Sequence, residues 1–121
     1  MPNEAPLMLD MVPELAEEIE RGLRDSGDAE LAEQVAGLRM LKSCGCGDDF
    51  CASFRTAPVP EGPAGRKRWG IPLDNHLIIH VLQNQIIEVE VLFRDDLRPK
   101  IRAVFGDEAD WRLRQKQSDQ N

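Results

Sequence analysis

The residues whose types and spacing could do chemistry are three cysteines within one eight-residue stretch, Cys-Gly-Cys-Gly-Asp-Asp-Phe-Cys. Cys44, Cys46 and Cys51 have the spacing C-x-C-x4-C. Thiolates are soft ligands that suit Zn²⁺, and a closed zinc site takes four donors. His76, His80 or an aspartate of the stretch could supply the fourth donor. The three cysteines and two histidines are therefore candidate zinc ligands, although common structural zinc sites repeat the spacing C-x2-C instead.

Two other interpretations of the cysteine stretch need no metal. A reactive cysteine requires a stabilised thiolate, and Cys51 beside a histidine is the pair that could act in redox or nucleophilic chemistry. Asp48 and Asp49 oppose this, because nearby carboxylates raise the pKa of a thiol. Alternatively, Gly45 and Gly47 let the chain reverse in a tight hairpin, where cysteines pack as small buried hydrophobes.

The two histidines form a second candidate together with two glutamates. His76 and His80 are four residues apart, so on a strand they point to the same face. Glu88 and Glu90 share a face of the next apolar run for the same reason. Imidazole and carboxylate groups together could bind a metal or transfer protons. The alternative is that these residues are only the wet face of a half-buried sheet.

A basic run beside an aromatic residue is the third candidate. Arg66, Lys67 and Arg68 precede Trp69, and such a run can bind phosphate and stack a base. The run is short and the chain has a net charge of −7, so we expect no nucleic-acid binding. More simply, these cations are solvated or face acidic helices, while Trp69 anchors the segment to the core.

The negative charge is concentrated in the first third of the chain. Residues 1–35 hold ten acidic residues against two arginines, which gives −8, whereas residues 36–121 hold twelve against thirteen cations, which gives +1. This field repels nucleic acid and anionic membrane surfaces. It predicts either a solvated helical face or an acidic surface through which the N-terminal helices bind a basic protein partner.

Length and composition indicate one domain spanning residues 1–121, with an ordered part of about 10–113. Its 41% of hydrophobic residues suit a single modest core. The apolar runs are too short to cross a membrane, and we recognise no secretory signal at the N-terminus. Three cysteines cannot all pair within one chain, and reduced thiols are the default without a signal. We therefore expect a cytoplasmic protein.

Two helices are predicted near the N-terminus, after loose residues 1–10. Apolar residues recur every four positions between Pro13, which can open a helix, and Ser26. Asp28 can cap a second helix that ends at Gly37. Joined by a tight turn, the two helices form a helical hairpin.

The pattern then changes to that of strands. Residues 38–43 and 50–57 predict a hairpin around the cysteine stretch. Residues 58–72 contain four prolines and three glycines, which predicts a long loop. Residues 76–82 and 86–93 predict two further strands, each with alternating apolar positions.

The pairing of the last two strands follows from which residues must share a face. Directly opposed residues lie on the same face of a sheet, so apolar residues should oppose apolar residues. A three-residue loop at 83–85 meets this requirement. It places Val81 opposite Ile87, and His80 opposite Glu88 on the more polar face.

A short C-terminal helix is predicted to begin at residues 95–96 and to end at Gly106. Trp111 and Leu113 are expected to pack back onto the body, and residues 115–121 are expected to be flexible. The predicted fold class is therefore α+β, with an N-terminal helical hairpin, an antiparallel sheet of about four strands and a short C-terminal helix.

Three segments resemble a group of small bacterial proteins with no established activity. They are the run Cys-Gly-Cys-Gly-Asp-Asp-Phe-Cys-Ala-Ser-Phe at 44–54, the Ile-Ile-Glu-Val-Glu-Val-Leu strand at 86–92 and Arg-Asp-Asp-Leu at 94–97. The resemblance extends over roughly residues 10–105, and the cysteine stretch is its most specific part. It implies a bacterial cytosolic protein of one α+β domain and carries over no catalytic residue.

No glycine-rich phosphate motif, H-E-x-x-H or G-x-S-x-G occurs in the sequence. We therefore expect a non-enzymatic binding or regulatory module that acts through a protein partner or a small ligand. The alternative is a zinc-binding or thiol-dependent protein centred on Cys44, Cys46 and Cys51.

Overall fold

The computed structural model describes residues 5–44, 50–60 and 62–106. Helices precede strands and a short helix closes the chain, which confirms the predicted α+β class. The elements in order are α1 (Met8–Met11), α2 (Pro13–Asp25), α3 (Ala29–Gln34), the 3-10 helix η2 (Val35–Gly37), β1 (Lys42–Ser43), β2 (Phe54–Arg55), the 3-10 helix η3 (Gly62–Lys67), β3 (Trp69–Leu73), β4 (Leu77–Leu82), β5 (Gln85–Val91) and α4 (Arg98–Val104).

The strands form one antiparallel sheet in the order β1-β2-β5-β4-β3. The sheet has five strands rather than about four, because β3 lies within the predicted loop 58–72. The prediction of a loop is therefore wrong over residues 69–72. Pro72 argued against a strand in the sequence. However, β3 is an edge strand, and proline is tolerated there because one side of the strand has no ladder partner.

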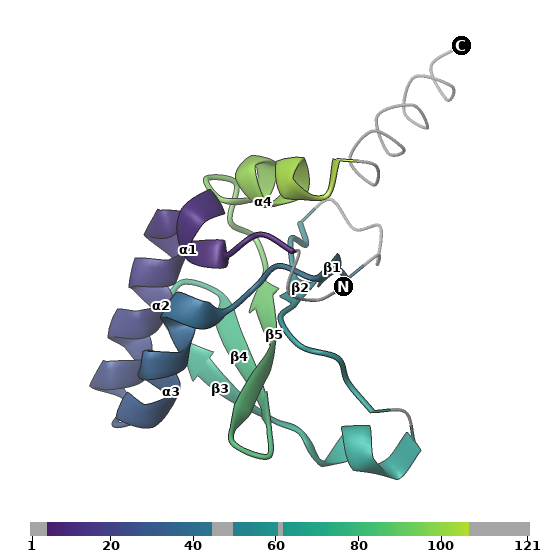
Figure 1. The fold of residues 1–121 in the computed structure, drawn as a ribbon. Helices are drawn as coiled ribbons and strands as arrows, with labels where there is room; N and C mark the ends of the chain where they lie inside the picture. Colours follow the sequence, from purple (N-terminus) through teal and green to yellow (C-terminus); the bar gives the residue numbers. More distant parts are fainter. Residues whose placement is uncertain (1–4, 45–49, 61, 107–121) are drawn as a thin grey trace.

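The two N-terminal helices lie against one face of the sheet, as Figure 1 shows for α2 and α3. Leu15, Ile19 and Leu23 are fully buried, so the predicted apolar stripe of α2 is confirmed. The second helix begins after Asp28, and η2 continues it to Gly37, as predicted. Burial of these stripes supplies the main core of the domain.

The prediction that residues 1–10 are loose is wrong for the part that the structure describes. Met8 begins α1 and is fully buried, and its N–H donates to the carbonyl of Leu38 at 2.9 Å. The N–H of Met40 donates to the carbonyl of Pro6, also at 2.9 Å. The start of the predicted strand 38–43 therefore pairs with the N-terminal segment. A four-residue helix is too short to show periodicity in the sequence.

The hairpin that frames the cysteine stretch is present but shorter than predicted. β1 and β2 have two residues each, and Ser43 pairs with Phe54. Phe54 also pairs with Val89 of β5 and is fully buried, so β2 is an interior strand. The predicted chain reversal at residues 45–49 lies outside the described residues.

The turn between β4 and β5 has two residues rather than the predicted three. Gln83 and Asn84 have φ values of 51° and 62°, and Leu82 pairs with Gln85. Positive φ at both central residues is typical of a type I′ hairpin turn, which matches the twist of the flanking strands.

A β-bulge restores the pairing that matters for the polar face. Val81 pairs with Ile86, so the predicted pairing with Ile87 is wrong. His80 nevertheless pairs with Glu88, as predicted, because Ile87 is an extra residue on β5. Ile86 lies in the main core, whereas Ile87 joins a smaller separate cluster.

The C-terminal helix α4 begins a few residues after the predicted start and ends before Gly106. Trp111, Leu113 and residues 115–121 lie outside the described residues. None of the helices in the described part of the chain has the length and apolar content needed to cross a bilayer.

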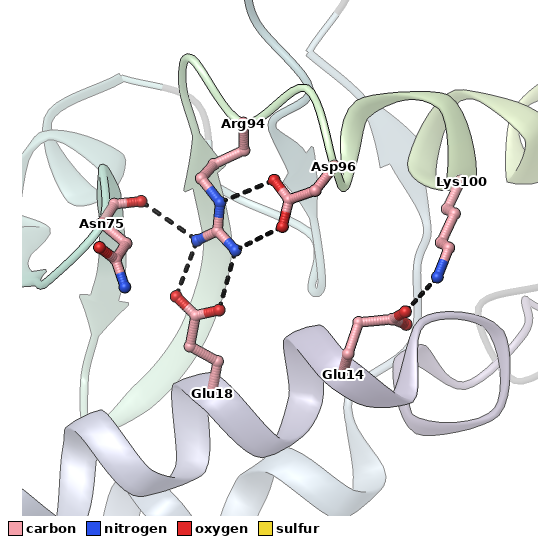
Figure 2. A network of polar contacts seen from close by, with 6 residues as sticks. All are labelled: Glu14, Glu18, Asn75, Arg94, Asp96 and Lys100. Atoms are coloured by element: carbon pink, nitrogen blue, oxygen red, sulfur yellow. Dashed lines mark hydrogen bonds and ion pairs between the residues drawn. The ribbon is translucent and has the colours of Figure 1, made fainter.

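Arg94 connects three segments that are distant in the sequence (Figure 2). Its Nη1 and Nη2 donate to the two carboxylate oxygens of Glu18 at 2.7 and 2.9 Å. It also donates to both oxygens of Asp96 at 2.9 and 3.0 Å, and to the carbonyl of Asn75 at 3.2 Å. The hydrogen bonds that Arg94 donates to Asp96 and Glu18 raise the pKa of Arg94 above its ordinary value. This network ties α2 to the chain between β5 and α4.

The ion pairs of α2 reduce the acidic surface that the sequence predicted. Glu18 binds Arg94, and Glu14 contacts Lys100 of α4. Glu17 and Glu20 each bind an arginine four residues later on α2. A protein partner on the N-terminal helices stays a prediction, with fewer available carboxylates than the count suggests.

Candidate functional site

The structure brings two of the three cysteines together. Cys44 directly follows β1, and its N–H donates to the carbonyl of Ser53 at 3.0 Å. Cys51 makes an antiparallel bridge with Leu92, which fixes it beside the end of β5. The two Sγ atoms lie 3.1 Å apart. Cys46 lies outside the described residues.

The two thiols differ in their access to solvent. Cys44 is exposed, whereas Cys51 is only 7% exposed. Cys51 is held between β1 and β5, and Cys44 lies where an edge strand ends. Cys44 is therefore the more accessible residue of the two.

The separation of the sulfurs limits the chemistry that the pair can do. A disulfide bond is about 2.05 Å long, so the sulfurs must approach by about 1 Å to form one. Two thiolates on a tetrahedral zinc ion, each about 2.3 Å from the metal, lie about 3.8 Å apart. The observed 3.1 Å falls between these values.

Two residues that the sequence interpretation missed contact Cys51. Its thiol donates to Oγ of Ser53 at 3.5 Å, and that hydroxyl accepts the N–H of Val91 at 2.9 Å. Nη2 of Arg102 donates to the carbonyl of Cys51 at 3.0 Å and so joins α4 to the site. Ser53 could have been found, because residues i and i+2 of a strand share a face. No sequence signal connects Arg102 with a residue 51 positions away.

The two histidines lie in different places, and neither is part of the cysteine pair. His76 is exposed, has a φ of 65°, and lies edge-on to Phe93 with ring centroids 5.6 Å apart. His80 lies on β4 beside Glu88 and Glu90. Among residues 5–44, 50–60 and 62–106, these three form the group of metal-ligating side chains that converges, and it contains no cysteine. The five-residue zinc set stays a prediction.

The polar cluster on β4 and β5 has its own contacts. Nε2 of His80 lies 2.9 Å from Oε1 of Glu90. Oε1 of Glu88 lies 3.2 Å from Nη1 of Arg68 and 4.0 Å from Nε of Arg55. All three ligand side chains are partly buried. The predicted grouping of His80 with both glutamates is thus present, while His76 is absent from it.

The residues of the basic run and Trp69 do not lie in one element of the structure. Lys67 ends η3, Arg68 binds Glu88, and Trp69 begins β3. Trp69 is 49% exposed, so it is a weaker anchor to the core than predicted.

No protein-family model, curated protein or solved structure matches this chain.

Proposed function

We propose that this chain is a thiol-dependent regulatory module in which Cys44 and Cys51 alternate between a dithiol and a disulfide. The observation that supports the proposal is the 3.1 Å separation of their Sγ atoms, with one thiol exposed and the other buried. This asymmetry is what a pair needs when one thiol meets the oxidant and the other resolves the product.

The co-reactant is a disulfide, R–S–S–R′, from a small thiol or a partner protein. The thiolate of Cys44 attacks one sulfur, the S–S bond breaks, and R′ leaves as a thiolate that takes up a proton. The thiol of Cys51 then loses its proton and attacks Sγ of Cys44, which releases R as a second thiol. The protein loses two protons and two electrons, and the incoming disulfide gains them.

The resulting disulfide would connect two parts of the fold. It would join the end of β1 to the segment that leads into β2, whose Cys51 carbonyl is bound by Arg102 of α4. The edge of the sheet and α4 would therefore respond to the same oxidation. A change at an exposed edge strand can alter the binding of a protein partner.

The proposal can be tested by trapping the intermediate with glutathione disulfide and measuring intact masses. Wild-type protein should lose two hydrogens and retain no glutathione. Cys51→Ser should stop with one glutathione on Cys44, and Cys44→Ser should react far more slowly. Cys46→Ser is the matched control, because only Cys44 and Cys51 remain in it, and it should also lose two hydrogens and retain no glutathione. A glutathione adduct that persists on Cys46→Ser protein would overturn the proposal.

A further inference from the structure

We propose that His80, Glu88 and Glu90 form a Zn²⁺ site on the face of the sheet that α2 and α3 do not cover. The site is independent of the proposed thiol function, since it shares no residue with the cysteine pair. It differs from the zinc set predicted from sequence, because its donors are one imidazole and two carboxylates on adjacent strands.

The donor atoms of His80, Glu88 and Glu90 lie close together. One ligand atom from each side chain lies within 4.8 Å of the other two. Donors on a tetrahedral zinc ion at about 2.0–2.1 Å are about 3.3 Å from one another. His80 Nε2 and Glu90 Oε1 are already 2.9 Å apart. Small side-chain rotations would therefore bring all three donor atoms within bonding distance of one zinc ion.

The two carboxylates of the cluster differ in their charged partners. Both arginine contacts go to one oxygen of Glu88, at 3.2 Å from Arg68 and 4.0 Å from Arg55. Within the described residues, the ion-pair contact of Glu90 is with His80. Glu90 thus has an imidazole as its ion-pair partner where Glu88 has guanidinium groups, and a bound cation would compensate its partly buried carboxylate.

The donor set identifies the ion. Imidazole with carboxylate ligands suits zinc, whereas Mg²⁺ and Ca²⁺ prefer oxygen donors alone. Three protein ligands leave a fourth position for water, as in zinc sites that bind a further molecule. Arg68 competes with the ion, because both need the carboxylate of Glu88.

The site can be tested by titrating Zn²⁺ into a full-length variant in which Cys44, Cys46 and Cys51 are all serine. Calorimetry should show one zinc ion per chain. His80→Ala or Glu90→Gln should weaken binding at least about 10-fold. Arg68→Ala should strengthen binding, whereas a purely structural ion pair predicts no gain. His76→Ala is the matched control and should bind as the parent does.

A second measurement covers the case in which the serine variant does not fold. In wild-type protein with alkylated thiols, zinc should shift the ring NMR signals of His80 and leave those of His76 unchanged. Absence of zinc binding in folded protein, or equal effects of the two histidine variants, would overturn the proposal. Loss of the thiol function in the serine variant would not affect this result.

Discussion

Replacing Arg94 by alanine should destabilise the domain more than any other change of a surface charge. Arg94 is 14% exposed and Glu18 is 28% exposed, and the two side chains form a bidentate pair at 2.7 and 2.9 Å. Charge-assisted hydrogen bonds of this kind, when their loss leaves a shielded partner, contribute roughly 2–3 kcal/mol. The exposed Asp96 adds little, because solvent screens a carboxylate that is 62% exposed.

Urea denaturation followed by far-UV circular dichroism measures this loss as a lower midpoint at unchanged slope. Arg94→Lys should recover part of the stability, since lysine keeps the charge but not the planar fork. Lys100→Ala is the matched control, because it also removes an ion pair with a glutamate of α2, but from an exposed pair. If Arg94→Ala and Lys100→Ala had equally small effects, the reasoning about Arg94 would be refuted.

The same network predicts a dependence on pH. A hydrogen bond from Arg94 lowers the pKa of Asp96 below its ordinary value. A lowered pKa in the folded state stabilises the protein at pH values above about 4, and this contribution is lost as the pH falls through the folded pKa. Arg94→Ala should therefore reduce the fall in stability between about pH 5 and pH 2 by a small amount, because solvent screens the exposed carboxylate of Asp96.

Two further variants and one oxidation test other parts of the fold by urea denaturation. Gln34→Ala should cost about 1–2 kcal/mol, because both polar atoms of the amide bond the backbone around the β4–β5 turn at 2.6 and 3.0 Å; exposed Glu33→Ala is its control and should be neutral. Phe54→Ala should cost about 3–5 kcal/mol, since it empties a fully buried position; a smaller loss would mean that the sheet collapses around the gap. Oxidation of Cys44 and Cys51 closes an eight-residue loop and should stabilise the protein by about 2.5 kcal/mol, whereas unchanged stability would show that no such loop forms.

Sequence periodicity was sufficient for the longer helix α2 and the central strands β4 and β5. The four-residue repeat of α2 and the alternation in β4 and β5 each determine which face is buried, and the structure buries those faces. The pairing of His80 with Glu88 was correct although the turn length was wrong, because burial of apolar residues fixes the register and the bulge at Ile87 absorbs the difference.

Short elements and distant contacts could not be read from the sequence. Because Pro72 is unusual in a strand, the sequence did not indicate the edge strand β3. The helix α1 has four residues, which are too few to show a period. The pair of Arg94 with Glu18 joins residues 76 positions apart, so only the folded chain reveals it. The sequence identified the cysteines and His80 as candidates, but only the structure separates them into two groups.

The most direct test of the proposed thiol function is an equilibrium titration of Cys46→Ser protein in glutathione buffers of graded ratio, with intact and fragment masses as the readout. The proposal predicts one two-electron transition that forms a Cys44–Cys51 disulfide at a potential between about −180 and −320 mV, the range of cellular thiol buffers. Two thiols that stay reduced throughout this range, or that are shielded by a bound zinc ion, would contradict it.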